Sequence, residues 1–576
     1  MLNFKFFFTL VILLNFLTVN AQTFQWGKRG GATDALDLVT SNLRQEEVYD
    51  IVTDSQRNIY ILSAVGKNGL DVDGVTKTNF GANSQITDIM LASFACDGTY
   101  RWSKVIGGKH YDNVNDISID QQDNIYIAGR FGSCNDTAYP PRIDNDVIIS
   151  QSPPDCSVNF LAKYNSSGVL QWIKRPQTAV TSVNAFSIGM DIDTAGNSYW
   201  LLQLPSGSYA DGAFVNTMTG QNFFILKYDT NGNYLSATYI DLQLSNGGFL
   251  AASKFYRNPY NGNFYITSSR GSSGETASAG GQTVTASTFI TSYSSTATFL
   301  WIRQNTNSTT GAIRLDRIVF DPDGSIYFSG SIIGLSLDSF IGLSVAEGIR
   351  TNFVMKTDAT VQTKLWSTYH PQNGAYDGAI ALNNNEIAFA GYCYNATFTW
   401  GSQTINVNGA NQGTEALLAR FDKNSGSCLG LTRILGETGY NDGGTALVVD
   451  NNGDYIYGGF AGRGMTFTTN TLLATGIQSD FFVAKYSSAV CSLGTDQFSE
   501  EELQIYPNPV KTSASISTKE ELNYVLYTLT GVELSNGKVN QYNNTIDLSA
   551  YPTGIYLLQT TATTNGNVKT VKVIKE

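Results

Sequence analysis

The sequence predicts an all-β chain in which a seven-bladed β-propeller is followed by a small Ig-like β-sandwich. Two phrases that recur seven times, and a separate C-terminal segment behind an acidic linker, support this fold class. The first phrase is an acidic turn followed by a strand with an aromatic or aliphatic anchor, clearest at residues 120–129. It recurs every 62 to 73 residues, and such self-similarity is typical of repeat architectures. The seven anchors are Tyr60, Tyr126, Tyr199, Tyr265, Tyr327, Phe389 and Ile456.

The second phrase is a strand of the form Phe-x-x-Lys-Tyr, followed in its best copies by a glycine turn and a tryptophan strand. Its clearest copy is residues 160–164, with Gly168 and Trp172 after it. Such short aromatic runs, bounded by Gly, Asn, Asp and Ser, are typical of strands and tight turns. The lysines of this phrase recur, so we expect their alkyl stems to cover apolar blade surface while the ammonium groups stay hydrated.

The phase of the two phrases predicts a closed ring. The seventh Phe-x-x-Lys-Tyr copy ends at Tyr486 with no tryptophan strand after it, whereas residues 24–28 form an isolated tryptophan strand at the other end. The N-terminal strand can therefore complete the last blade, and closure leaves only short sheet edges. A solenoid is the alternative, but it would not need the terminal strand.

Residues 1–21 have the pattern of a secretory signal peptide. Lys5 supplies the positive end, residues 6–17 are mostly apolar, and a small-residue site predicts cleavage between Ala21 and Gln22. The apolar run is short for a membrane anchor, which is the alternative interpretation, and no later run approaches a membrane span. We therefore expect residues 22–490 to form the propeller of the mature chain.

The charge balance argues against some partners. The chain has 36 basic and 48 acidic residues, a formal net charge of −12, and removal of Lys5 with the signal gives 35 minus 48, or −13. An acidic protein is poorly suited to bind nucleic acid or an anionic membrane surface. It remains compatible with cations, neutral glycans or protein ligands.

Six cysteines in an exported chain predict disulfides, although six allow 15 connectivities. Cys134 and Cys156 bracket a proline-rich insertion within one repeat, and Cys393 and Cys428 lie within another. These two pairs are the connectivity that we favour, and the others stay open.

The C-terminal segment is predicted to be a separate module. Residues 491–502 form a linker, and residues 503–576 contain short predicted strands separated by Gly, Asn and Pro turns. The two prolines of Tyr506-Pro507-Asn508-Pro509 cannot donate ladder hydrogen bonds, so this motif should open the domain. Further motif positions are Gly531, Gly554, Tyr556 and Lys575.

Both parts resemble known families. The repeats of residues 22–490 resemble those of secreted bacterial seven-bladed β-propellers. The tail resembles the type A C-terminal sorting domain of the Bacteroidota type IX secretion system, with an ordinary Ig-like binding domain as the alternative. The resemblance implies passage through the periplasm, recognition by the type IX machinery, and a secreted or outer-surface location. It also implies that the motif residues of the tail, Tyr506 to Pro509, Gly531, Gly554, Tyr556 and Lys575, carry the sorting signal.

No catalytic or metal-binding constellation stands out, and we name no catalytic or metal residue. Oxygen-rich turns at residues 71–74, 321–324 and 450–454 suit calcium, but none has the downstream bidentate Glu, so turns explain them equally. His110 and His370 are expected to be exposed loop residues on one face, since neither accompanies a nucleophile or metal motif. Asp50 and Asp116, at equivalent positions before inner strands, could form a carboxylate pair.

The sequence thus predicts a non-enzymatic scaffold for adhesion, glycan capture or protein interaction, because a unique catalytic site should break the symmetry of the repeats. Propellers host many functions, so the fold itself does not decide. Two alternatives remain. One is a polysaccharide hydrolase or lyase with acids at the propeller axis, and the other is a calcium-stabilised structural module.

Overall fold

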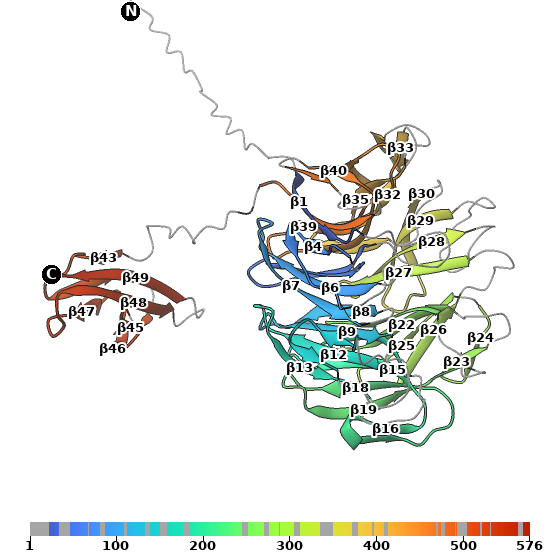
Figure 1. Cartoon of the computed structure of the whole chain (residues 1–576), viewed down its shortest axis with the longest axis horizontal. Coiled ribbons are helices and arrows are strands. Elements are labelled where there is room, and N and C mark those ends of the chain that lie inside the picture. The colour runs from blue at the N-terminus through green and yellow to red at the C-terminus, as the bar shows by residue number, and fades with distance from the viewer. Residues whose placement is uncertain are drawn as a thin grey trace, which may run out of the picture. The chain divides into compact units, whose positions relative to one another are not determined.

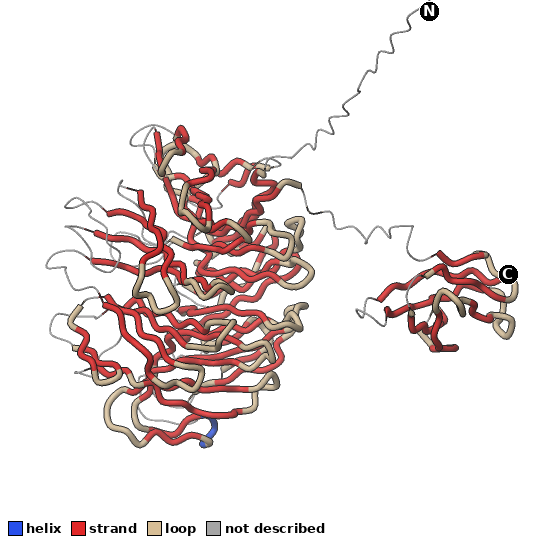
Figure 2. The backbone as a smooth tube through the Cα atoms, turned by 180° about the vertical axis from the view of Figure 1, so that it is seen from behind, coloured by secondary structure: helices blue, strands red, loops and turns tan. Residues whose placement is uncertain are grey.

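The structure is a computed structural model whose residues divide into two compact units, residues 1–491 and 492–576. The described residues are 22–33, 46–66, 68–80, 87–108, 112–132, 139–149, 158–176, 185–244, 251–269, 276–286, 288–304, 312–333, 350–370, 378–393, 397–407, 413–467, 470–473, 479–489, 491, 504–518, 521–529, 531–562 and 568–576. They are almost entirely strands (Figure 2), as predicted; one short 3-10 helix spans Ala210–Gly212.

In the part of the first unit that the structure describes, seven antiparallel sheets with four main strands each form the blades of a propeller (Figure 1). We number the blades in chain order and give the four strands of each blade from the innermost to the outermost. Blade 1 is β2 (Val48–Thr53), β3 (Ile59–Val65), β6 (Asp88–Phe94) and β7 (Tyr100–Gly107); blade 2 is β8 (Asn113–Ile119), β9 (Ile125–Phe131), β12 (Val158–Tyr164) and β13 (Leu170–Lys174); blade 3 is β14 (Phe186–Ile192), β15 (Ser198–Leu204), β18 (Asn222–Tyr228) and β19 (Tyr234–Ile240).

The other four blades repeat this order. Blade 4 is β21 (Ala251–Arg257), β22 (Phe264–Ser269), β25 (Thr288–Tyr293) and β26 (Phe299–Gln304); blade 5 is β27 (Ala312–Phe320), β28 (Ile326–Ile333), β29 (Arg350–Thr357) and β30 (Lys364–His370); blade 6 is β31 (Ala379–Asn383), β32 (Glu386–Cys393), β35 (Glu415–Asp422) and β36 (Cys428–Arg433); blade 7 is β38 (Gly443–Val449), β39 (Tyr455–Ala461), β42 (Asp480–Ser487) and β1 (Thr23–Gly31).

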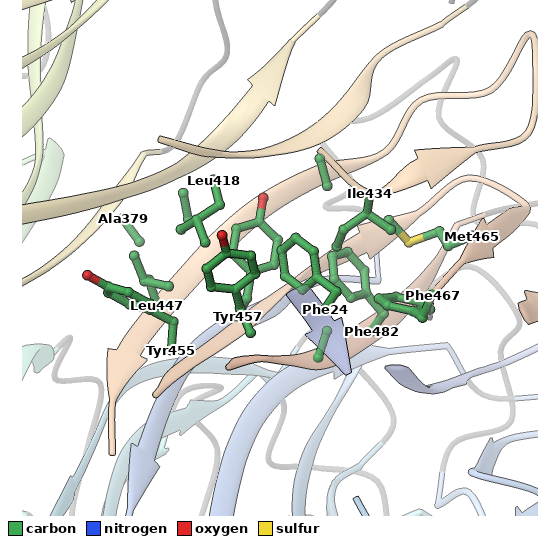
Figure 3. Packing of buried hydrophobic residues seen from close by; sticks show 14 of the residues in the cluster. Phe24, Ala379, Leu418, Ile434, Leu447, Tyr455, Tyr457, Met465, Phe467 and Phe482 are labelled. Atoms are coloured by element: carbon green, nitrogen blue, oxygen red, sulfur yellow. The ribbon is translucent and has the colours of Figure 1, made fainter. Parts of the chain in front are cut away.

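The N-terminal strand closes the ring, as the phase of the repeats predicts. β1 pairs antiparallel with β42 of blade 7, so both ends of the propeller contribute to one sheet. Phe24 of β1 packs against the rings of Tyr457, Phe467 and Tyr486, in a hydrophobic cluster that blade 7 shares with blade 6 (Figure 3). A disulfide between Cys96 and Cys491, 395 residues apart in the chain, adds a covalent link at the same closure.

The first recurring phrase forms a bonded turn. In blade 2, Asp120 accepts hydrogen bonds from the backbone N–H of Asn124 at 2.9 Å and from the Tyr126 hydroxyl at 3.0 Å. The Lys163 ammonium lies 3.7 Å from the same carboxylate. The turn, the anchor tyrosine and the lysine of the second phrase therefore form one structural unit, as expected of Asx-type turns.

The expectation of hydrated lysines is wrong for Lys163 and Lys485. Lys163 is buried, and Lys485 of β42 is fully buried with its ammonium 2.8 Å from Asp450. Burial in a blade requires that the charge be paired, and the recurring acidic turn supplies the partner. The lysine of blade 3, Lys227, stays partly exposed and lies 3.8 Å from Asp193.

The second phrase links consecutive blades. Trp102 of blade 1 donates its indole N–H to the Ser166 carbonyl of blade 2 at 3.1 Å. The indole also packs on Gly168 (φ +77°), where an added Cβ would lie 2.5 Å from the Trp102 ring. Three further pairs repeat this glycine–tryptophan contact: Gly98 with Trp26, Gly232 with Trp172, and Gly426 with Trp366.

Short hairpins lie between the second and third strands of the blades. Four of them pair with the outermost strand, or with its extension, in the preceding blade, and so connect neighbours at the rim. The hairpins are β4 (Asp71–Val72) with β5 (Val75–Thr76), β10 (Arg142–Ile143) with β11 (Val147–Ile148), β16 (Gly207–Tyr209) with β17 (Phe214–Asn216), β23 (Ala277–Ala279) with β24 (Gln282–Val284), β33 (Thr397–Trp400) with β34 (Gln403–Asn406), and β40 (Gly464–Thr466) with β41 (Thr471–Leu473); β20 (Leu242–Leu244) and β37 (Leu435–Gly436) are the extensions.

The second unit is a two-sheet β module. Buried residues of both sheets, among them Ile516 and Leu558, share one hydrophobic core, so the sheets pack face to face. One sheet has the order β43 (Gln504–Tyr506), β44 (Ser513–Ser517), β47 (Thr545–Asp547); the other has the order β46 (Glu533–Val539), β45 (Leu522–Thr528), β48 (Gly554–Ala562), β49 (Val568–Lys575). Among the residues described in either unit, no helix is long and apolar enough to cross a membrane.

Candidate functional site

The innermost strands face one another around the propeller axis, and irregularities in them set which side chains point there. The register shifts by one residue between Val48 and Asp50 in β2, between Val114 and Asp116 in β8, and next to Arg317 in β27. A β-bulge bends a strand and changes the direction of the side chain that follows it. Similar shifts occur in β14, β21 and β38. Among the charged side chains that follow such a shift, we take Asp50, Asp116 and Arg317 as the candidate axial site, and Lys254 of β21 adds a further positive charge that acts on Asp116.

Arg317 connects two blades that are not neighbours. Its guanidinium lies 3.2 Å from the Asp50 carboxylate and donates a 2.5 Å hydrogen bond to the Tyr49 carbonyl. Arg317 belongs to blade 5, whereas Tyr49 and Asp50 belong to blade 1. Because both charged side chains are mostly buried, this pair braces the interior of the ring.

Asp116 is held by the next blade. Its Oδ2 accepts a 2.8 Å hydrogen bond from the backbone N–H of Met190 in β14. Gly189 provides the space, since a Cβ there would lie 2.6 Å from the same oxygen. Burial and the nearby Asp50 carboxylate raise the pKa of Asp116 well above its usual range, while the Met190 N–H and Arg317 oppose that rise.

Asp191 repeats this arrangement one blade further on. Its carboxylate accepts hydrogen bonds from the N–H of Ile192 at 2.7 Å and from the N–H of Arg257, in β21 of blade 4, at 2.9 Å. Burial raises the pKa of Asp191 to about 6. An aspartate that bonds the inner strand of the next blade is thus shared by consecutive blades, which is the behaviour of a scaffold residue.

The two carboxylates of the predicted pair lie near enough for their charges to interact, but their place in the strands differs from the prediction. Asp50 and Asp116 lie within β2 and β8 rather than before them, and their charges interact. Arg317 was not predicted from the sequence, although it lies at the bulge position equivalent to that of Asp50. Aligning the inner strands of blades 1 and 5 would have placed these opposite charges at the same level of the ring.

The oxygen-rich turns have cationic side chains where calcium would bind. Asp321 lies 2.7 Å from the Lys423 ammonium, and Asp73 lies 2.8 Å from that of Lys28. Asp450 is paired with Lys485 at 2.8 Å. Among the described residues, no group of three or more His, Cys, Asp or Glu side chains is placed to hold a metal ion.

His370 is not an exposed loop residue. It ends β30, is 4% exposed, and stacks on Phe398 with ring centroids 4.0 Å apart. Burial lowers its pKa to about 4. The other histidine, His110, lies outside the described residues.

The favoured pairing of Cys393 with Cys428 is wrong, because both are free, buried thiols. Cys393 pairs with Glu415 at one end of β35, whereas Cys428 pairs with Phe421 near the other end. Proximity in sequence therefore did not bring them together. Cys134 and Cys156 lie outside the described residues, and the disulfide that the structure contains joins Cys96 to Cys491.

The predicted sorting residues gather at one end of the second unit. Gly554 pairs with Lys575 in the sheet, and Asn508 bonds the backbone of Lys572 and Ile574. Gly531 forms the turn after β45, whose last residue, Thr528, pairs with Tyr556. At the predicted signal cleavage site, the side chain of Gln22 accepts a 3.4 Å hydrogen bond from Arg420, and Ala21 lies outside the described residues.

Two segments match known families. Residues 504–576 match the family described as "Secretion system C-terminal sorting domain", and residues 101–130 match the family described as "Beta-propeller repeat". The chain is thus a β-propeller protein with a type IX sorting domain. It is exported through that system to the cell surface or the extracellular space. The comparison with curated proteins finds no match.

Similar solved structures include the Dos1 propeller, with 8% identity and a TM-score of 0.40 over 81% of this chain and 96% of that one. A Dyadobacter fermentans protein of unknown function has 9% identity and a TM-score of 0.35 over 80% and 98%. PorZ, a surface component of the type IX secretion system of Porphyromonas gingivalis, has 10% identity and a TM-score of 0.18 over 93% and 99%. These likenesses carry no argument about what this chain binds.

Proposed function

We propose that the propeller is a non-enzymatic scaffold for adhesion, glycan capture or protein interaction, delivered as cargo of the type IX system. The observation that supports this most is the axial site. Asp50 is paired with Arg317, and Asp116 bonds the backbone of the next blade. Carboxylates engaged in bracing the ring are poorly placed to exchange protons with a substrate.

The organisation of the mature chain follows from the same proposal. Residues 1–21 are removed as a signal peptide, residues 22–490 act outside the cell, and residues 491–502 separate them from the sorting domain of residues 503–576. The acidic charge makes nucleic acid an unsuitable partner and leaves glycans or proteins as the proposed ligands. A disulfide between Cys134 and Cys156 remains our expectation for the proline-rich insertion.

One observation favours the enzymatic alternative. Two nearby carboxyl groups, one with a raised pKa, are what a glycoside hydrolase uses as acid and base or nucleophile. In that case Asp116 would be the acid and Asp50 the second carboxylate. For the third alternative, a calcium-stabilised module, the described turns offer lysine-paired aspartates instead of vacant oxygen ligands.

The test is a glycan array and a polysaccharide panel applied to the mature protein, together with Asp116→Asn and Asp50→Asn. We expect no cleavage by the wild type, and ligand capture that both substitutions leave intact. Cleavage that disappears in Asp116→Asn would overturn the scaffold proposal and establish the enzyme. Silence on the array together with failure to bind cells or secreted proteins would overturn it as well.

A further inference from the structure

Among the described residues, the C-terminal strand of the sorting domain has one side that no other strand of its own sheet covers. β49 is the last strand of its four-stranded sheet, its neighbouring strand is β48, and Val510 forms an isolated bridge to Lys575 on the other side. An open strand edge presents unpaired N–H and C=O groups and invites pairing with another chain. The segment Tyr506-Pro507-Asn508-Pro509-Val510 lies along the C-terminal half of this edge, where it makes the contacts described next.

Asn508 bonds β49 as a strand would. Its side-chain Nδ2 donates to the Lys572 carbonyl at 2.8 Å, and its Oδ1 accepts from the Ile574 N–H at 2.8 Å. The side-chain amide thus offers one donor and one acceptor to the same strand, as a neighbouring peptide group does. Pro507 and Pro509 on either side have no N–H, so neither residue can donate a backbone hydrogen bond to β49.

Val510 completes the contact. Its N–H donates to the Ile574 carbonyl at 2.7 Å, and its carbonyl accepts from the N–H of Glu576 at 2.9 Å. The Val510 side chain is fully buried in the core of the domain. The last residues of the chain are therefore held between β48 and the segment that opens the domain.

We propose that Asn508 is the positioning residue of the sorting signal: it clamps the C-terminal strand in the register that the secretion machinery recognises. The motif residues at the two ends of the domain then act as one unit, since Asn508 at its start fixes Lys572 to Glu576 at its end. This explains why a polar residue stands between two prolines. The proposal concerns export and does not depend on what the propeller binds.

The test uses the full chain in a bacterium with a type IX system, with Asn508→Ala compared against Asn536→Ala. Asn536 is an exposed asparagine of β46, at the other edge of the same sheet, and its side chain donates a 2.7 Å hydrogen bond to the Glu533 side chain. Removing both hydrogen bonds with Asn508→Ala should speed amide exchange in residues 570–576 about 30-fold. The exported fraction of Asn508→Ala should fall as well, while Asn536→Ala changes neither measurement.

Three results would overturn the proposal. Export of Asn508→Ala at the wild-type level would separate the clamp from sorting. Unchanged exchange in residues 570–576 would show that no clamp exists. Faster exchange throughout β45 and β48 would show that Asn508 supports the whole fold instead of positioning one strand. None of these outcomes bears on the ligand of the propeller.

Discussion

Lys485 is a fully buried charge in the blade that closes the ring. Its ammonium lies 2.8 Å from Asp450 and 3.0 Å from Asp454, and the side chains of Lys485 and Asp450 are fully buried. Asp450 also accepts the backbone N–H groups of Asn452 and Asp454. Replacing Lys485 with methionine keeps the shape of the stem and leaves the Asp450 carboxylate buried without its main cationic partner.

Breaking a buried pair on one side costs about 3–5 kcal/mol, because the remaining charge loses its compensation. The repeat offers a matched control in Lys227, which occupies the equivalent position in blade 3. Lys227 lies 3.8 Å from Asp193 and its side chain is 26% exposed, so Lys227→Met should cost less than about 1 kcal/mol. The structure therefore predicts a difference of about 3 kcal/mol between two identical substitutions.

Urea unfolding of the mature protein, followed by intrinsic fluorescence, measures this difference. Asp450→Asn added to Lys485→Met should restore part of the loss, because it removes the uncompensated charge. Equal destabilisation by Lys485→Met and Lys227→Met would refute the reasoning. So would a double variant that is less stable than Lys485→Met alone.

Three further predictions follow from the blades. Gly168→Ala should lower the free energy of unfolding, measured in urea, by about 1–3 kcal/mol more than Gly220→Ala does. Both glycines have φ +77°, but of the two only Gly168 has an indole within 4 Å, so equal losses of stability would contradict the interblade contact. Replacing Cys96 and Cys491 with serine should lower the free energy of unfolding by about 2–5 kcal/mol, and an unchanged urea midpoint would argue against the disulfide. Between pH 6.5 and pH 4 the wild-type protein should lose up to about 3 kcal/mol of unfolding free energy that His370→Phe does not lose. The reason is that His370 is protonated near pH 6.5 in the unfolded state and only near pH 4 in the native state. Identical pH dependence of the unfolding free energy in the two proteins would contradict the burial of His370.

The ring could be predicted because its evidence is repeated. A single copy of the acidic turn is weak evidence for any fold. Seven copies at similar spacing, the last of them lacking its tryptophan strand, together predict a closed ring. Pairing of β1 with β42 follows directly from the isolated strand around Trp26. The sorting motif was equally accessible, since Tyr506 to Pro509 is a local pattern.

Contacts between distant repeats could not be predicted in the same way. The Cys96–Cys491 disulfide depends on ring closure in three dimensions, whereas the pairing of Cys393 with Cys428 was inferred from proximity in sequence. Arg317 reaches Asp50 across the interior of the ring, a relation that no linear spacing encodes. Residues that recur in every repeat could be assigned to the scaffold from the sequence, whereas the role of non-repeating residues such as Arg317 depends on contacts that only the three-dimensional structure shows.

Disulfide mapping tests the closed ring most directly. The mature protein is denatured without a reductant so that buried free thiols can be alkylated, it is then digested without reduction, and linked peptides are identified by mass spectrometry. The structure predicts a peptide pair joining Cys96 to Cys491, with Cys393 and Cys428 both alkylated. A peptide pair joining Cys393 to Cys428, or Cys96 linked to any other cysteine, would contradict the closure.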